Sequence, residues 1–428
     1  MQLAELKYKT SIPLSQSTGF LLISVLYFFL NDIFLPQGLL YTDLLAPFFI
    51  WWLYRHFQLH LLLYFFAFTT PFILIHFHDN ASPWYYYRSY IMFFTAVVFA
   101  VSFYVSLKEG YALSPVFKKI LILNFGLFCL ALLALHFPEL IKAFWYLKPI
   151  TPGVNSFPRL KLFTYEASYY SLLLAPVAIY FYLRLCLFKT KKPALLFLMV
   201  TLPLFFSLSF GVIACIGLTL FILICLRAKL FLRKKSVVYF LLISALLALA
   251  VVIAILKMDP HNPLFFRIHN IFTGRDTSFR GRTYESFILA LKIMKEKSIL
   301  FGVGLGQVKI VGVSVFKQYY GYLPPVVRIP NTLGDTMATY GIAGLGIRMF
   351  FTIFLFFRLK IWRNYYQLGM FIFMFIYQFT GSFMTNIAEY VIWVLAYTPA
   401  FREFDKNKLM GPVIKYERPL ENINAFAS

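Results

Sequence analysis

Residues 166–188 read EASYYSLLLAPVAIYFYLRLCLF, an apolar run with one acid at its start and one arginine near its end. A helix rises about 1.5 Å per residue, so a run of this length crosses the roughly 30 Å hydrocarbon core of a membrane. Helices satisfy every backbone polar group inside that core. The run therefore predicts a transmembrane helix, and the rest of the chain repeats its pattern.

The composition places the whole chain in one class. Hydrophobic residues make up 61% of the 428 residues and aromatic residues 20%, and the mean hydropathy is +0.74. Such a chain cannot be solvated as a globular surface. We predict an all-α, polytopic membrane bundle of about ten to twelve spans, a single integral membrane domain over 1–428. The predicted spans are 17–35, 39–54, 59–76, 89–106, 118–136, 166–188, 193–209, 211–228, 236–257, 332–357, 366–383 and 386–401.

Two pairs of these spans are joined by very short turns, near Phe210 and near Thr385. Each pair is alternatively one broken or re-entrant element, because so few residues leave little room for a loop outside the membrane.

Lysine and arginine are distributed unevenly between alternate loops, which predicts the orientation. One set of loops carries Arg55, Lys108, Lys118, Lys119, Arg184, Lys189, Lys191, Lys192, Arg227, Lys229, Arg233, Lys234, Lys235, Arg358, Lys360 and Arg363. The short loops of the other set hold almost none, Arg88 being the clear case. Both termini, including the tail 402–428, are therefore predicted to be cytoplasmic. The two long loops, 137–165 and 258–331, are predicted to face outward, into the periplasm.

The formal net charge of +23 would suggest nucleic acid in a soluble protein. Here the positive-inside rule accounts for much of it. It does not account for the basic residues of the outward loops, which predict an anionic partner outside. These residues are Lys142, Lys148, Arg159, Lys161, Arg267, Arg275, Arg280, Arg282 and Arg328.

Cysteines indicate neither a disulfide framework nor a metal site. Cys129, Cys186, Cys215 and Cys225 all lie inside or at the edge of predicted spans.

Four acids lie near the outward ends of four predicted spans: Asp43, Glu166, Asp335 and Glu389. They either converge on a functional site, as ionisable groups at membrane depth often do, or simply follow the preference of acids for helix starts. Arg348 lies about four turns beyond Asp335. It either lines a pathway or, the favoured interpretation, extends its side chain to the cytoplasmic interface.

Residues 282–297, RTYESFILALKIMKEK, have apolar side chains at helical spacing on one face. This pattern predicts an amphipathic helix along the outer membrane surface. Arg280 and Arg282 would lie at or just before its start, where guanidinium and free backbone N–H groups together receive a phosphate. The alternative is a solvated basic edge that touches lipid head groups.

The glycines at 302, 304 and 306 form a GxGxG pattern that suggests a nucleotide loop, yet no strand precedes it and no Lys-Ser/Thr follows. A flexible turn or close backbone packing is the better interpretation.

The order of these motifs resembles the O-antigen ligase/polymerase superfamily, which includes Wzy-type polymerases and WaaL-type ligases. Arg159 precedes a span that opens with Glu166-Ala167-Ser168, and the large outward loop carries an arginine, the amphipathic helix and the run FGVGLG at 301–306. Pro330-Asn331 and the run GIAGL at 341–345 follow. The resemblance covers about 155–350, and its motifs are degenerate.

The resemblance implies a GT-C-like membrane glycosyltransferase in the bacterial cytoplasmic membrane. It would act at the outer face on glycans linked to undecaprenyl diphosphate, with no cofactor and no metal. Arg159 and Arg282 would clamp the diphosphate, with Arg280 as the rival of Arg282. Glu166 would be the general base or would hold an arginine in position. The residues predicted to contact substrate are Arg275, Arg328, Asn331, Asp335 and Tyr165.

Ligases commonly carry a histidine beside the asparagine that opens the span after the large loop, whereas this chain has Ile329-Pro330-Asn331. This favours a polymerase that transfers the growing chain onto incoming lipid-linked repeat units, in O-antigen, capsule or exopolysaccharide synthesis. The alternatives are a ligase that transfers glycan to lipid A-core or protein, and a transporter or flippase of lipid-linked sugars. Expected partners are the lipid-linked oligosaccharide and membrane lipids, with a chain-length regulator as a further candidate and no nucleic acid.

Overall fold

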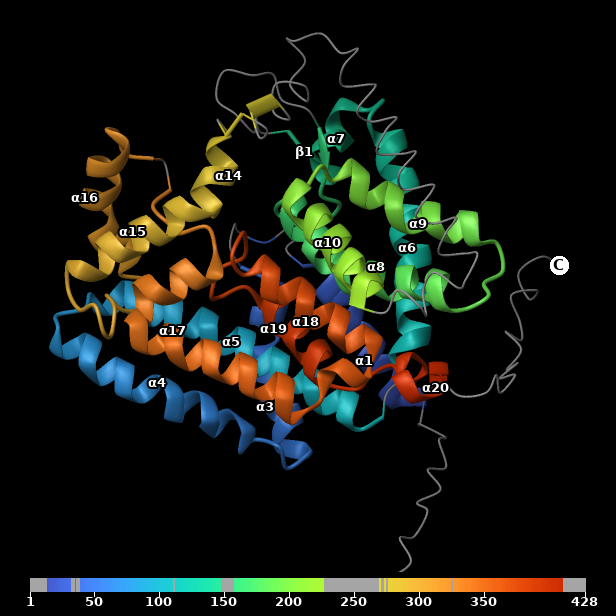
Figure 1. Cartoon of the computed structure of the whole chain (residues 1–428), viewed down its shortest axis with the longest axis horizontal. Helices are drawn as coiled ribbons and strands as arrows, with labels where there is room; N and C mark the ends of the chain where they lie inside the picture. Colours follow the sequence, from blue (N-terminus) through green and yellow to red (C-terminus); the bar gives the residue numbers. More distant parts are fainter. Residues whose placement is uncertain are drawn as a thin grey trace, which may run out of the picture.

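The computed structural model describes residues 14–31, 35, 39–110, 112–147, 158–226, 269–270, 273–274, 276–324 and 326–410. In this part of the chain seventeen α-helices and one two-stranded ribbon are present (Figure 1). The helices are α1 (Leu14–Phe28), α2 (Tyr41–Leu44), α3 (Ala46–Arg55), α4 (Leu61–His78), α5 (Pro83–Lys108), α6 (Leu113–Ala134), α7 (Pro138–Phe144), α8 (Ala167–Leu187), α9 (Pro193–Phe206), α10 (Phe210–Leu226), α14 (Thr277–Arg282), α15 (Tyr284–Lys295), α16 (Val308–Tyr320), α17 (Thr332–Arg358), α18 (Tyr365–Tyr377), α19 (Ile387–Tyr397) and α20 (Lys406–Met410). The antiparallel strands are β1 (Trp145–Tyr146) and β2 (Arg159–Leu160).

Five of the described helices are long and apolar enough to cross a membrane: α4, α5, α6, α8 and α17. Each matches a predicted span within a few residues. The all-α class and the multi-pass membrane character are therefore confirmed. The predicted span 236–257 lies outside the described residues.

The predicted spans on either side of Thr385 are shorter in the structure. The helices α18 and α19 have 13 and 11 residues, which rise only about 20 and 16 Å. Neither crosses a hydrocarbon core of roughly 30 Å alone. The structure agrees with the broken-element interpretation for this pair, and the residues from Gln378 to Asn386 form a non-helical connection between the two helices.

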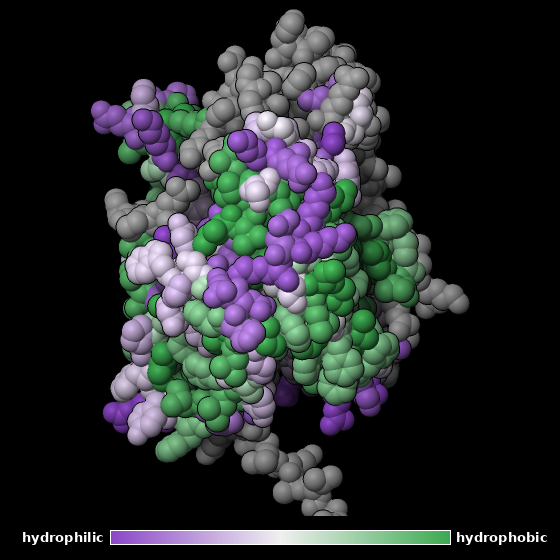
Figure 2. Space-filling model, turned by 90° about the vertical axis from the view of Figure 1, so that its left-hand side faces the viewer, coloured by the Kyte–Doolittle hydropathy of each residue, from purple (hydrophilic) through white to green (hydrophobic). Residues whose placement is uncertain are grey.

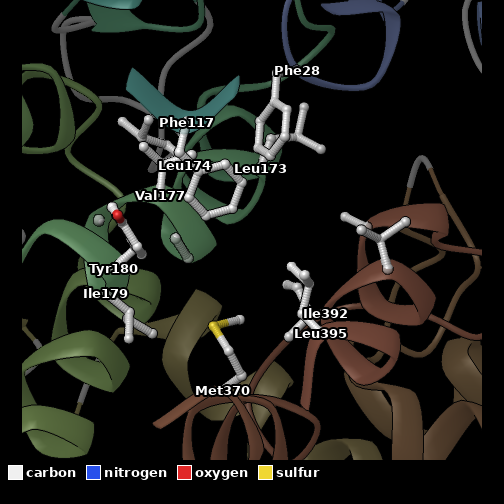
Figure 3. Close-up of a cluster of buried hydrophobic side chains, with 14 of the residues drawn as sticks. Phe28, Phe117, Leu173, Leu174, Val177, Ile179, Tyr180, Met370, Ile392 and Leu395 are labelled. Atoms are coloured by element: carbon white, nitrogen blue, oxygen red, sulfur yellow. The ribbon is translucent and has the colours of Figure 1, made fainter. Parts of the chain in front are cut away.

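Helix α8 is the centre of the bundle, because nearly all of its residues are buried. A helix that is apolar on every side is stable inside a protein core or in lipid, and here other helices surround α8. Figure 3 shows Phe28 of α1, Phe117 of α6, Met370 of α18 and Ile392 of α19 converging on Leu173 and its neighbours in α8. This packing holds the start of α8 at one end of the bundle.

Loops predicted to lie on the same side of the membrane meet at the same end of the bundle. Lys297, in the large loop, donates from Nζ to the carbonyl of Asp79 at the end of α4, at 2.9 Å. Nε2 of His56, after α3, lies 3.6 Å from the carboxylate of Glu109, after α5. The alternation of loops is thus consistent with the charge pattern, while the assignment of the outer face stays a prediction.

The large loop carries a second layer of helices. The predicted amphipathic helix is present as α15, and α16 was not predicted. Both pack on the start of α17 through a small core that includes Leu289, Ile293, Phe316 and Met337. In Figure 1 α15 and α16 lie on the left, and Figure 2 shows that side with a band of hydrophilic residues between apolar surfaces.

Close backbone packing explains the glycine-rich turn. The N–H of Val303 donates to the carbonyl of Ala338 at 2.9 Å, so the turn is bonded to the backbone of α17. Helix α17 is interrupted at Gly341, which has φ +65° and ψ −163°. A Cβ there would lie 2.3 Å from the carbonyl oxygen of Leu300. The prediction of close packing, in place of a nucleotide loop, agrees with this arrangement.

We expect Gly341→Ala to destabilise the protein by at least about 2 kcal/mol, because this backbone region admits essentially only glycine and the neighbouring carbonyl leaves no space. The matched control is Gly346→Ala in the same helix, where nothing lies within 4 Å of an added Cβ. Melting temperatures of both variants in detergent test the expectation. Equal melting temperatures would contradict it.

Candidate functional site

A pocket opens at the end of the bundle where α8, α17 and α19 begin. It holds about 450 Å³ of space, counting the part open to solvent. Its lining residues are Tyr165, Glu166, Ser168, Tyr169, Leu172, Arg282, Arg328, Ile329, Pro330, Tyr377, Ser382, Phe383 and Asn386. Four residues predicted from the sequence, Tyr165, Glu166, Arg282 and Arg328, therefore lie together although they come from distant segments.

Glu166 reaches the pocket because it is the last extended residue before α8, with φ −149°. A tight turn precedes it, in which the hydroxyl of Thr164 donates to the carbonyl of Lys161 at 2.8 Å and to that of Glu166 at 3.0 Å. Among the described residues, the carboxylate of Glu166 has no hydrogen bond and no ion-pair partner within 4 Å. A half-buried acid without a partner can accept a proton from a bound ligand.

Arg159 lies behind the pocket wall. Strand pairing places it opposite Tyr146, and its guanidinium carbon lies 4.8 Å from the centre of that ring. The side chain is 8% exposed, and its Nε has no hydrogen-bond partner in the described structure. Burial lowers the pKa of Arg159, Glu166 raises it, and the charge of Arg282 lowers it again. An arginine keeps its charge under these conditions, so Arg159 adds positive potential to the pocket.

The two rival arginines diverge because they are two residues apart in α14, where each residue turns the helix by about 100°. Thr283, at φ −97° and ψ −110°, then separates α14 from α15. Arg280 turns to Glu285 and forms an ion pair at 2.8 Å, whereas Arg282 lines the pocket. The side-chain amide of Asn331 donates to the carbonyl of Arg282 at 2.7 Å and so holds its backbone in place.

Asn331 and Asp335 support the pocket without lining it. The Oδ1 atom of Asn331 accepts from the N–H of Gly334 at 2.7 Å and caps α17. One carboxylate oxygen of Asp335 accepts from the N–H of Met384 at 3.0 Å and so ties α17 to the α18–α19 connection. Arg275, the remaining predicted contact residue, lies outside the described part of the chain.

Arg348 and Glu389 form an ion pair inside the bundle. The preferred interpretation of Arg348, a side chain that extends to the interface, is therefore wrong. The reason is that a fully buried carboxylate lies within its reach, and an unpaired charge at this depth is costly. Glu389 also accepts from the hydroxyl of Thr332 at 2.6 Å and from that of Ser382 at 2.7 Å.

This network shapes one wall of the pocket. Ser382 has φ +67°, a conformation that is unfavourable for a residue with a side chain. Glu389 on one side and the amide of Asn386, at 3.0 Å, on the other hold its hydroxyl. Ser382, Phe383 and Asn386 were not predicted as site residues. The sequence features that point to this region are the short turn near Thr385 and the acid Glu389. Neither feature shows which residues contact Glu389.

We expect Arg348→Met to destabilise the protein by about 3–5 kcal/mol, because it leaves the charge of Glu389 buried and unpaired. The double variant R348M/E389Q is expected to recover most of this loss, since the amide carries no buried charge and its oxygen still accepts from Thr332 and Ser382. The control is Tyr170→Phe, which removes a buried hydroxyl that donates to Asn124 and takes no part in the ion pair. Thermal melting in detergent measures all three, and a double variant no more stable than the single one would contradict the account.

No protein-family model matches the sequence, and no curated protein does. The superfamily resemblance therefore remains a prediction from the order of the motifs. Function must be inferred from the pocket and its charges.

Proposed function

We propose that the protein is a membrane glycosyltransferase that polymerises lipid-linked oligosaccharides. The observation that carries the proposal is a pocket at the end of a membrane bundle that combines two arginines with an acid whose carboxylate forms no hydrogen bond or ion pair within 4 Å among the described residues. The arginines fit a lipid-bound diphosphate, which needs cations. The acid fits an acceptor hydroxyl, which needs a base.

Arg282 and Arg328 are the candidates to hold the diphosphate. Both line the pocket from the large loop, and arginine binds phosphate oxygens in a bidentate manner. Arg159 lies close enough for its charge to interact with Arg282 and Glu166. Three cations against one carboxylate favour a strongly anionic ligand. They would also stabilise the charge that develops as the diphosphate leaves.

Glu166 is the candidate general base. In the proposed reaction a hydroxyl of the incoming unit attacks the anomeric carbon of the chain held by its lipid diphosphate. The new glycosidic C–O bond forms as the bond from that carbon to the phosphate oxygen breaks. The hydroxyl proton passes to Glu166, and undecaprenyl diphosphate departs with the bonding electron pair. The charge of Glu166 also acts on Arg159, so the same acid is a candidate to hold that arginine in position.

The remaining pocket residues suit such a substrate. Tyr165 is partly exposed at the pocket and can contact a sugar, whereas Tyr169 and Tyr377 are buried and shape the wall. Leu172 is buried too and lines the pocket about one turn inside α8. Ile329 and Pro330 line the position where a ligase histidine is expected, which supports a polymerase over a ligase.

We expect Arg282→Ala and Arg328→Ala each to lower the rate of chain growth at least about 100-fold, because each removes a cation from the developing negative charge. The assay uses purified protein in liposomes with undecaprenyl-diphosphate-linked repeat units, and products are separated by gel and mass. Arg88→Ala is the matched control, an exposed arginine at the same predicted face that does not line the pocket.

Three outcomes of this assay would contradict the polymerase. The first is equal ladders from wild type and both pocket variants. Transfer of glycan only to a lipid A-core acceptor would identify a ligase. Movement of the lipid across the bilayer, without chain growth from a matched repeat unit, would identify a transporter.

Glu166→Gln separates the two roles of the acid. If Glu166 is the general base, Glu166→Gln should lower kcat about 100-fold or more and leave the affinity for undecaprenyl diphosphate unchanged. Glu139→Gln, an exposed acid of the first outward loop, is the control. Lost affinity for the lipid diphosphate, with kcat retained at saturation, would instead assign Glu166 to holding an arginine.

A further inference from the structure

A cluster of tyrosines surrounds the ion pair of Arg280 and Glu285, outside the pocket. Tyr284 is the first residue of α15, Tyr319 and Tyr320 end α16, and Tyr322 follows after Gly321. We refer to Tyr284, Tyr319, Tyr320 and Tyr322 as the tyrosine cluster. None of these residues lines the pocket.

The cluster has a fixed geometry. The hydroxyl of Tyr320 donates to Glu285 at 3.1 Å, and its ring lies 4.9 Å from that of Tyr319 at an angle of 87°. Gly321, at φ +76°, ends α16 in a left-handed turn. This turn brings the ring of Tyr322 to 5.9 Å from that of Tyr320. The carboxylate of Glu285 therefore anchors two aromatic segments that are about thirty-five residues apart.

Two tyrosines of the cluster, Tyr319 and Tyr284, each contact a cation. Nζ of Lys292 lies 5.2 Å from the centre of the Tyr319 ring, and the guanidinium of Arg280 lies 5.8 Å from that of Tyr284. Cation–π contacts of this kind restrict how the rings move. Tyr284 and Tyr322 nevertheless remain 50% and 62% exposed. The cluster therefore has two exposed rings, and its other members are fixed by hydrogen bonds and cation–π contacts.

The cluster also presents a hydrogen-bond donor. The side chain of Arg280 is 42% exposed, whereas the carboxylate of Glu285 is 5% exposed and binds Arg280 and Tyr320. Burial and the charge of Glu285 raise the pKa of Tyr319 and of Tyr320, so both hydroxyls stay protonated.

Sugars match this surface better than lipid does. A pyranose ring has an apolar face of C–H groups that stacks on an aromatic ring, and its rim of hydroxyls both donates and accepts. Lipid tails would gain nothing from the ion pair at the centre of the cluster, because they carry no polar group to meet it. Arg280 and Arg282 belong to the same six-residue helix, so the cluster begins within about one helical turn of a pocket residue.

We propose that the tyrosine cluster is a carbohydrate-binding platform that holds sugars of the lipid-linked glycan beyond the unit in the pocket. The source of the glycan rests on the proposed function. The binding itself does not, since the exposed rings of Tyr284 and Tyr322 and the exposed guanidinium of Arg280 are recognition groups for any oligosaccharide.

The test uses the full chain in nanodiscs and a free oligosaccharide, released by mild acid from the undecaprenyl-diphosphate-linked glycans of cells that make the protein. Saturation-transfer NMR measures its affinity. We expect the double variant Y284A/Y322A to lose about tenfold in affinity and Y284F/Y322F to stay near wild type, because stacking needs the rings and not their hydroxyls. Tyr54→Ala, an exposed tyrosine at the opposite end of the bundle, is the control.

The outcomes separate the two proposals. No binding to wild type, or equal binding to Y284A/Y322A, overturns the platform, even if chain growth is observed. Equal binding together with a lower melting temperature of Y284A/Y322A in nanodiscs would identify the tyrosines as membrane anchors. Loss of binding in Y284A/Y322A without chain growth by wild type supports the platform and overturns the polymerase.

Discussion

The ion pair between Arg348 and Glu389 is the interaction on which the pocket depends. Two charges inside a membrane bundle are tolerated only when they meet each other and satisfy further polar groups. Here the carboxylate also receives the hydroxyls of Thr332 and Ser382. It thereby joins the start of α17 to the connection between α18 and α19, and the unfavourable backbone of Ser382 persists because of these bonds.

The long helices could be predicted because apolar length alone identifies a membrane span. Glu166 and Arg282 were predicted as site residues from the resemblance, and the structure brings both to one pocket. The partner of Arg348 could not be predicted, since it lies 41 residues away and the contact depends on how three helices pack. Helix α16 was missed although its buried residues Val308, Gly312, Val315 and Phe316 recur at helical spacing, because its β-branched residues and its internal glycine favour a helix only weakly. That Arg282 and not Arg280 faces the pocket depends on how α14 is oriented, which composition does not reveal.

The pocket and the tyrosine cluster differ in chemistry. The pocket gathers positive charge, and the cluster presents neutral rings farther along the same loop. Arg280 and Arg282 belong to these different surfaces because residues two apart in a helix point to different sides of it. Under the proposed function, one loop would bind both the anionic and the saccharide part of a lipid-linked glycan.

The most direct test is a cryo-electron microscopy map of the full chain with an undecaprenyl-diphosphate-linked repeat unit. The account predicts density for the diphosphate between Arg282 and Arg328, with the first sugar beside Glu166. Density for the diphosphate elsewhere on the protein, with the pocket empty, would contradict the assignment of this pocket as the site of glycan transfer.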